Sequence, residues 1–336
     1  MKRIGKRSIL FKNCPSIAGF AACVGKKEGE GPLREYFDKV FDDDMLGQQS
    51  WEQAESMLQK EAFMRATEKS GHKSDKIDTI FAGDLLNQCT ASAFGFKGQS
   101  SSYLGQYGAC STMAQTLLLA SVFCSCGASN CSAAVTSSHF CSAERQFRNP
   151  LDYGGQRPPT AQWTVTGSGA VIVDCNSSPL CIKGGTFGKI TDLGITDANN
   201  MGAAMAPAAA ETISDFLGDV ENELSYPDLI LTGDLGKIGS GLLIELLNKN
   251  GMNISAIHKD CGTMIYDLER QDVHAGGSGC GCSASVLCGK ILPDMLKGHY
   301  RSVLFVGTGA LQSPTSIQQG ETMPAIAHAV LIERKE

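Results

Sequence analysis

The sequence predicts an α/β fold made of two similar halves, each alternating strands with helices. The tripeptides Gly83-Asp84-Leu85 and Gly233-Asp234-Leu235 each end an apolar run, and they lie 150 residues apart (positions 84 and 234). Apolar helical patterns open at Cys110 and Cys280, and in both cases the next predicted strand is centred 25 residues further on, at positions 135 and 305. A repeat at a fixed offset indicates a duplicated unit, and the alternation indicates buried sheets covered by helices.

The first half opens with strand-like runs at 8–11 and 17–24. From 51 to 69, apolar residues recur at helical spacing with charged residues between them, which predicts an amphipathic helix. Ser50 is a suitable N-cap for this helix, and Gly71 is a suitable stop.

A buried strand follows at 77–85, and the run after Cys110, residues 113–123, is too apolar for a surface helix. Next come a strand at 132–139, a polar, basic and aromatic loop at 140–162, and a strand at 163–173 with a glycine-rich entry. Cys110 is thus predicted in the first turn of a buried helix, where free amides and the helix dipole favour an anion.

The second half repeats this plan with strands at 227–235, 302–307 and 325–332 and a helix from Cys280. A competing alignment pairs Cys110 with Cys261 at an offset of 151, but it leaves surplus residues before the next strand. We therefore prefer the Cys280 alignment, with an N-terminal half at 1–175 and a C-terminal half at 176–336.

The charge balance excludes some classes of partner. The 336 residues include 29 basic and 35 acidic side chains, a net charge of −6, so the sequence has no basic footprint for nucleic acid. The basic N-terminus resembles the start of a signal peptide, but Lys12, Asn13 and Pro15 interrupt the apolar segment. No segment is predicted to span a bilayer, so a cytoplasmic-type soluble protein is expected.

The 14 cysteines favour a reduced compartment rather than a disulfide framework, because they lie inside the apolar runs of a long chain. Cys280-Gly281-Cys282 is too tight for a usual zinc site, and no Asp-x-Asp calcium loop is present. The sequence therefore predicts no metal site and no cofactor. Eight cysteines are predicted to be buried as small apolar residues: Cys124, Cys126, Cys131, Cys141, Cys175, Cys181, Cys282 and Cys288.

Several strings resemble the thiolase superfamily, whose duplicated five-layered α-β-α-β-α fold is shared by thiolases and ketoacyl synthases. They are the Gly-Ala-Cys-Ser turn at Cys110, the strand with its glycine-rich entry at 166–172, and the turn at 307–309. The resemblance covers nearly the whole chain. It implies a homodimer, with the segment 101–106 pairing edge strands across the interface.

Longer strings narrow the resemblance to the stage V sporulation AD family of spore-forming Firmicutes. They are His139 with 143–147, the loop 153–163, and the segment 272–280. The resemblance implies a protein of the forespore and spore inner membrane that acts with other stage V sporulation A proteins. Its implied role is to bind pyridine-2,6-dicarboxylate (dipicolinate), alone or with calcium, during uptake into the spore.

An acyl-transferring relative needs histidine or asparagine partners for its cysteine. By the resemblance, those positions fall on Gly233 and Cys280, and neither glycine nor a neutral thiol can act as acid or base at neutral pH. The expected result is a pocket without the chemistry. Cys110 is interpreted first as a pocket-lining thiol, with a working nucleophile and inert core packing as the alternatives.

A small dicarboxylate suits a pocket faced by two helix N-termini, and arginines of the long loop (Arg145, Arg148 and Arg157) are candidate carboxylate partners. Asp84 and Asp234 are interpreted chiefly as loop-capping acceptors, while His139 could equally anchor its loop. The full set of predicted ligand-binding residues is Cys110, Ser111, His139, Arg157, Gly233, Asp234, His274, Gly277, Cys280 and Gly309.

Three functions remain open from the sequence. The first is a non-catalytic dipicolinate-binding protein. The second is a thioester-dependent acyltransferase or thiolase that uses Cys110 as its nucleophile. The third is a scaffold whose pocket is vestigial and whose surface holds a membrane complex together.

Overall fold

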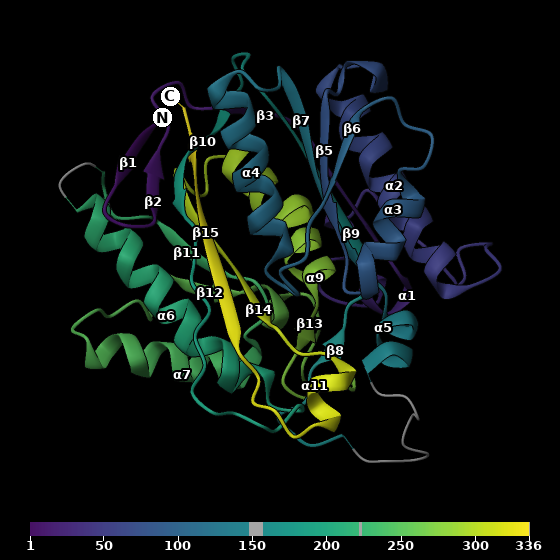
Figure 1. Cartoon of the computed structure of the whole chain (residues 1–336), viewed down its shortest axis with the longest axis vertical. Helices are drawn as coiled ribbons and strands as arrows, with labels where there is room; N and C mark the ends of the chain where they lie inside the picture. The colour runs from purple at the N-terminus through teal and green to yellow at the C-terminus, as the bar shows by residue number, and fades with distance from the viewer. Residues whose placement is uncertain (148–156, 222–223, 336) are drawn as a thin grey trace.

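A computed structural model describes residues 1–147, 157–221 and 224–335 of the chain, and its two halves share one plan (Figure 1). In the first half the strands lie in the order β6-β5-β7-β9-β3. Strands β5, β6 and β7 are mutually parallel, whereas β9 is antiparallel to β7 and β3. The bounds are β3 (Ser16–Val24), β5 (Thr79–Gly83), β6 (Ser102–Gly105), β7 (Cys131–Ser138) and β9 (Gly167–Asp174).

The second half repeats this order as β12-β11-β14-β15-β10. Here β11, β12 and β14 are parallel, and β15 is antiparallel to β14 and β10. The bounds are β10 (Leu180–Thr186), β11 (Leu229–Thr232), β12 (His258–Asp260), β14 (Ser302–Ala310) and β15 (Ala325–Arg334). The duplicated fold predicted from the repeat is therefore confirmed, and the division at residue 175 stays a prediction.

The two half-sheets join where Ser16 of β3 pairs with Cys181 of β10. Five shorter strands complete the sheets: β1 (Lys2–Ile4), β2 (Ser8–Leu10), β4 (Lys39–Val40), β8 (Trp163–Thr164) and β13 (Gly277–Ser278). β13 pairs with β8 in a separate two-stranded sheet, which joins residues of the two halves.

Helices form three layers around the two half-sheets (Figure 1). α2 (Trp51–Ser70) and α3 (Thr90–Gly95) cover the outer face of the first half, and α6 (Met201–Val220) and α7 (Gly236–Lys249) cover that of the second. α4 (Thr112–Cys126) and α9 (Cys280–Val286) lie between the sheets. The remaining helices are α1 (Lys26–Gly29), α5 (Phe140–Phe147), α8 (Cys261–Met264), α10 (Leu292–Leu296) and α11 (Pro314–Gln318), with a π-helical segment at Leu287–Ile291.

The order of these elements decides between the two alignments of the repeat. α4 leads to β7, and α9 with α10 leads to β14, which is the equivalent strand of the second sheet. Cys261 instead opens the four-residue helix α8 directly after β12. Cys110 and Cys280 therefore hold equivalent places, as the preferred alignment predicted.

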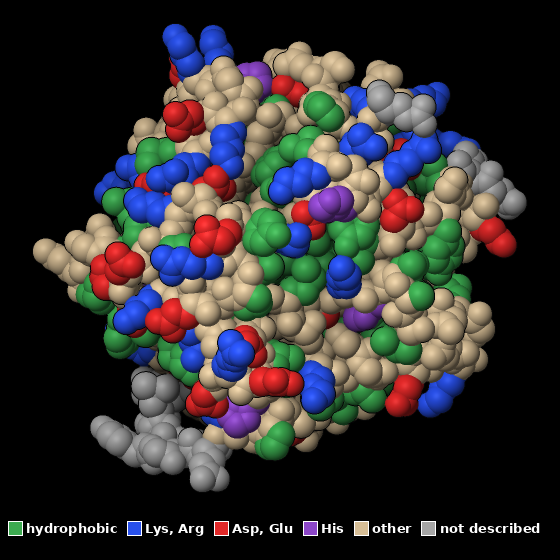
Figure 2. Space-filling model, turned by 180° about the vertical axis from the view of Figure 1, so that it is seen from behind, with side chains coloured by type: hydrophobic (Ala, Val, Ile, Leu, Met, Phe, Trp, Pro, Cys, Tyr) green, Lys and Arg blue, Asp and Glu red, His purple; other side chains and the backbone are tan. Residues whose placement is uncertain are grey.

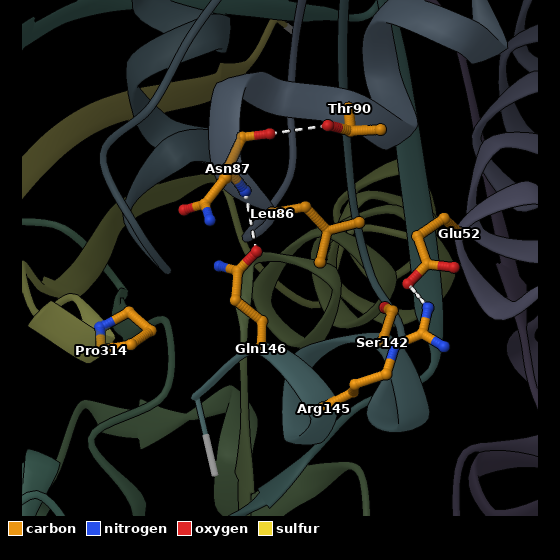
Figure 3. A pocket seen from close by; sticks show the side chains of 8 residues that line it. All are labelled: Glu52, Leu86, Asn87, Thr90, Ser142, Arg145, Gln146 and Pro314. Carbon is orange, nitrogen blue, oxygen red and sulfur yellow. Dashed lines mark hydrogen bonds and ion pairs between the residues drawn. The ribbon is translucent and has the colours of Figure 1, made fainter. Parts of the chain in front are cut away.

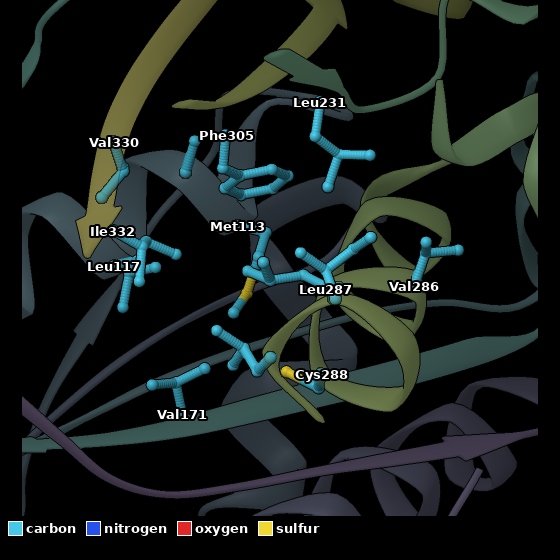
Figure 4. Packing of buried hydrophobic residues seen from close by; sticks show 14 of the residues in the cluster. Met113, Leu117, Val171, Leu231, Val286, Leu287, Cys288, Phe305, Val330 and Ile332 are labelled. Atoms are coloured by element: carbon cyan, nitrogen blue, oxygen red, sulfur yellow. The ribbon is translucent and has the colours of Figure 1, made fainter. Parts of the chain in front are cut away.

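The middle layer is the apolar centre of the molecule (Figure 4). Met113 and Leu117 of α4 pack with Phe305 of β14, Val330 of β15 and Leu287. By length and composition alone, the segment Ala109–Cys126 is apolar and long enough to cross a membrane. The fold buries 67% of that segment, as expected for a core helix between two sheets.

The ends of α2 confirm the capping prediction. The Ser50 side chain accepts a hydrogen bond from the backbone N–H of Gln53, and Gly71 has φ = 74°, the left-handed conformation that glycine adopts readily. Ser50 thus satisfies one of the four free N–H groups at the start of the helix, and the Gly71 N–H satisfies the Glu68 carbonyl at its end.

Two sequence predictions need correction. Residues 140–147 form helix α5 rather than a loop. Its polar residue Ser142 faces inward and donates its hydroxyl to the buried Glu55 carboxyl. A polar side chain on the buried face makes the composition of this helix resemble that of a loop. Residues 148–156, including Arg148, lie outside the described residues.

Among the cysteines predicted to be buried, Cys126 and Cys175 are exposed and Cys141 is half-buried. Cys126 is the last residue of α4 and Cys175 directly follows β9, which leaves both side chains open to solvent.

The surface carries mixed charge. Figure 2 shows lysines and arginines interspersed with acidic side chains over the face seen there. This agrees with the modest net charge of −6.

Candidate functional site

Cys110 follows a strained turn at the start of α4. Ala109 has φ = 49°, a left-handed conformation that is uncommon for residues other than glycine. Two side chains hold this turn: the Ser111 hydroxyl donates to the Gly108 carbonyl, and the Thr112 hydroxyl donates to the Ala109 carbonyl, both at 2.6 Å. Strain maintained in this way is typical of functional sites.

The Cys110 side chain is buried in a small apolar cluster with Leu85, Ala143 and Cys280, which we name the Cys110 cluster. Its thiol lies beside the Asp234 carboxyl. Burial, followed by the charge of Asp234, raises the pKa of Cys110 well above its ordinary value. The group is therefore a neutral thiol at neutral pH, not the thiolate that a nucleophile requires.

Asp234 connects three separate segments at this site. Its carboxylate accepts the Thr308 hydroxyl and the Gly279 backbone N–H, both at 2.8 Å, and lies beside the Cys110 thiol. Burial raises the pKa of Asp234 to about 7, although these hydrogen bonds act to lower it. Its predicted role as an acceptor is confirmed, but it links distant segments rather than capping its own loop.

Cys280 and two glycines complete the floor of the site. The Cys280 thiol is fully buried and donates to the Ser137 carbonyl at 2.9 Å. A Cβ on Gly309 would lie 2.3 Å from the Gly108 carbonyl oxygen, so only glycine fits against the Cys110 turn. A Cβ on Gly233 would lie 3.2 Å from the Thr308 backbone nitrogen, a tight contact beside Asp234.

The predicted histidine and arginine contacts are engaged elsewhere. Buried His139 donates from Nε2 to the Asp44 carbonyl at 2.8 Å, because its Nδ1 accepts the Cys141 backbone N–H. His274 and Arg157 both contact the exposed Asp272 carboxylate, at 3.2 and 2.6 Å. Their roles as ligand contacts stay predictions, as does that of Gly277, which pairs with Trp163 in the small sheet.

All six histidines of the chain have polar partners other than Cys110. Besides His139 and His274, the pairs are His72 with Asp174, His258 with Thr232, His299 with Asp294, and His328 with the backbone N–H of Gly188. The polar groups next to the Cys110 thiol are the Asp234 carboxyl and the Gly279 backbone, and neither is an imidazole.

A surface cavity is lined by residues that neighbour two members of the Cys110 cluster along the chain, and Figure 3 shows its lining. Its volume is about 330 Å³, and Leu86 and Ser142 in its lining directly follow and precede the cluster residues Leu85 and Ala143. We name it the mouth cavity. Its lining is Glu52, Leu86, Asn87, Thr90, Ser142, Arg145, Gln146 and Pro314.

Gln146 fixes one wall of the mouth cavity. Its side-chain amide donates to the Leu85 carbonyl and accepts the Asn87 backbone N–H, both at 2.9 Å. These two bonds tie α5 to the segment that leads from β5 into α3. The cavity wall is therefore built from both elements together.

One polar face of α2 was missed by the sequence analysis. The buried carboxyl of Glu55 accepts the Ser137 and Ser142 hydroxyls at 2.8 Å, and Gln59 donates to Ser137 and to the Gly83 carbonyl. Burial, followed by the charge of Asp84, raises the pKa of Glu55 to about 8. Positions 52, 55 and 59 share one helix face, and that spacing was the available signal.

A family model described as stage V sporulation protein AD matches residues 5–333 of this chain. The chain is also 44% identical over 334 residues to the stage V sporulation protein AD of Bacillus subtilis (strain 168), covering 99% of this chain and 98% of that protein. The chain belongs to the stage V sporulation protein AD family.

Solved structures outside the family share its fold. Cerulenin-bound OleA of Xanthomonas campestris superposes with a TM-score of 0.62 at 13% identity, covering 96% of this chain and 98% of OleA. The 3-oxoacyl-[acyl-carrier-protein] synthase III of Aquifex aeolicus gives 0.56 at 12% identity, covering 95% and 99%. At these identities the likeness shows a thiolase-like fold and no more.

Proposed function

We propose that this member of the family binds pyridine-2,6-dicarboxylate in the mouth cavity beside the Cys110 cluster, without catalysis. In this proposal it serves the uptake of that ligand, alone or as its calcium chelate, into the developing spore. Family membership supports the sporulation role, and the site supports binding over turnover.

The observation that carries the proposal is the partner of Cys110. A thiol becomes a nucleophile when a neighbouring base or cation stabilises the thiolate. Here Cys110 is buried against Asp234, whose charge raises the pKa of the thiol further. A strained turn presents Cys110, but the electrostatic surroundings of the Cys110 thiol oppose its ionisation.

The mouth cavity offers groups that suit a carboxylate ligand. Arg145 supplies a guanidinium that can hold a carboxylate through two parallel hydrogen bonds, and the exposed Asn87 supplies a side-chain amide. Leu86 supplies an apolar surface for an aromatic ring. A small aromatic dicarboxylate matches this combination of one cation, neutral donors and an apolar wall.

Isothermal titration calorimetry with pyridine-2,6-dicarboxylate tests the proposal, with pyridine-3,5-dicarboxylate as the matched isomer. We expect saturable binding of the 2,6 isomer only, and loss of about tenfold or more in affinity for Arg145→Gln. Arg34→Gln, on an exposed side chain, is the control. Equal binding of both isomers, or wild-type affinity in Arg145→Gln, would count against the proposal.

A second candidate function, thioester-dependent acyl transfer at Cys110, is favoured by the strain at Ala109, which a simple binding pocket does not need. Incubation with acyl-coenzyme A followed by mass spectrometry separates the two functions. An acyl adduct on Cys110 that turns over would establish the enzyme. The binding function predicts no adduct.

We also propose a homodimer formed through β6, the edge strand of the first half-sheet. All four residues of β6 are exposed, among them Tyr103 and Leu104, and an open edge with apolar side chains favours pairing with a second copy. Light scattering measures the molar mass of wild type and of Leu104→Lys in solution, and a monomeric mass for both would reject the dimer.

We propose as well that the protein associates with other stage V sporulation A proteins at the spore inner membrane. Co-purification with those proteins tests this association.

A further inference from the structure

The Arg145 side chain in the mouth cavity already holds a carboxylate. It is hydrogen-bonded to Glu52, and Figure 3 shows the two side chains meeting on one side of the cavity, beside Ser142. Arg145 also lies 5.1 Å over the Trp51 ring, which positions its guanidinium. The principal cation of the cavity is therefore paired in the ligand-free protein.

Both helices favour this pair. Glu52 lies in the first turn of α2, where the helix dipole favours negative charge, and Arg145 lies in the last turn of α5, where it favours positive charge. Partial burial acts to raise the pKa of Glu52, but the hydrogen bond from Arg145 and the nearby charges lower it below the ordinary value. Glu52 is thus an ionised carboxylate at neutral pH.

We propose that Glu52 is a built-in competitor for the carboxylate ligand: it occupies Arg145 in the free protein and must release it before the ligand binds. This inference rests on the function proposed above. A ligand carboxylate exchanges one ion pair with Arg145 for another, so part of its binding free energy is spent displacing Glu52. Glu52 therefore lowers the affinity for the carboxylate ligand.

The pair is partly exposed, which limits the size of the effect. The Arg145 and Glu52 side chains are 48% and 28% exposed. Ion pairs of this kind are weak and sensitive to salt. We expect Glu52→Gln, which keeps the shape and removes the charge, to bind pyridine-2,6-dicarboxylate about two- to fivefold more tightly than wild type.

A double-mutant cycle separates competition from simple charge repulsion. If Glu52 acts by occupying Arg145, its removal improves affinity only while Arg145 is present, so Glu52→Gln brings no gain in an Arg145→Gln background. If Glu52 merely repels the ligand, the gain is the same in both backgrounds. Glu35→Gln, whose side chain is 89% exposed, is the matched control and should leave affinity unchanged.

Calorimetry on the full-length variants at low and at high salt gives every term of this cycle. Tighter binding by Glu52→Gln that depends on Arg145 supports the competitor. Binding by wild type with equal or weaker binding by Glu52→Gln overturns it and leaves the proposed function standing. Absence of binding by wild type and all variants overturns both, so the two failures are distinct.

Discussion

Asp84 and Asp234 hold equivalent places in the two halves but make different kinds of contact. Each stands in a Gly-Asp-Leu sequence after an equivalent strand, β5 or β11. Asp84 accepts hydrogen bonds from the Leu86 backbone and from the backbone and hydroxyl of Ser92, all within eight residues of itself. Asp234 accepts from Gly279 and Thr308 and lies beside Cys110, and these three residues belong to separate segments.

The different contacts of Asp84 and Asp234 show how the two halves of a duplicated fold come to differ. The same tripeptide closes its own loop in the first half and joins three segments in the second. The repeat fixes where each carboxyl lies, whereas the segments packed around it decide which groups it contacts. The candidate site lies where Asp234 of the second half meets Cys110 of the first.

The largest expected effect is on the free energy of unfolding when each carboxyl is removed. Asp234→Ala leaves donors in three buried segments without a partner, and we expect it to lower the free energy of unfolding by about 3–5 kcal/mol. Asp84→Ala should cost less, about 1–3 kcal/mol, because its donors lie in one loop and its removal relieves repulsion of Glu55. Urea denaturation measures both; equal losses would contradict the distinction.

The pH dependence of the free energy of unfolding reports the protonation of Asp234. An unfolded aspartate loses its proton near pH 3.8, whereas the pKa of folded Asp234 is about 7. Between these values unfolding releases a proton, so the stability contributed by this group is full below pH 3.8 and falls as the pH rises to about 7. Asp234→Asn should flatten the decline by up to about 1.4 kcal/mol per pH unit.

Urea denaturation at pH 5, 6 and 7 measures that slope. The exposed Asp75→Asn is the control and should keep the wild-type slope, because its carboxyl is in water in both states. An unchanged slope in Asp234→Asn would show that this carboxyl is already ionised in the folded protein.

The smallest expected effect is on the reactivity of Cys110. After burial, the charge of Asp234 is the largest cause that raises the pKa of this thiol, so Asp234→Asn should increase its alkylation rate, by roughly two- to tenfold. Asp84→Asn should leave the rate unchanged. Iodoacetamide labelling followed by peptide mass spectrometry reports Cys110 separately, with exposed Cys126 as the internal reference. Equal acceleration by both variants would mean general loosening rather than a direct contact.

Much of the fold was predictable because its signals are local. The ends of α2 follow from Ser50 and Gly71, and the duplicated sheet follows from the repeat between positions 84 and 234. The place of α5 was missed because its polar face is satisfied by Glu55, a residue 87 positions away from Ser142. Sequence alone gives no sign of that partner.

The site was less predictable than the fold, because its character comes from tertiary contacts. Cys110, Asp234 and Cys280 could be named from motif positions, but the approach of Asp234 to the Cys110 thiol depends on the packing of one half on the other. The hydrogen bond that His139 donates to the Asp44 backbone carbonyl could not be predicted either, because the two residues lie 95 positions apart. The Glu52, Glu55 and Gln59 face was visible in the spacing but resembled ordinary helix charge.

The pairing of Ser16 with Cys181 has a consequence for cooperativity in folding. Each half-sheet has its own outer apolar core, with α2 on one side and with α6 and α7 on the other, whereas α4 and α9 share the middle one. At this joint the sheet supplies the Ser16–Cys181 pair and the pairing of β2 with β10, whereas the middle core extends between the two sheets. The two halves therefore depend on the central helices to unfold as one unit, and the Cys110 turn lies at the start of one of them.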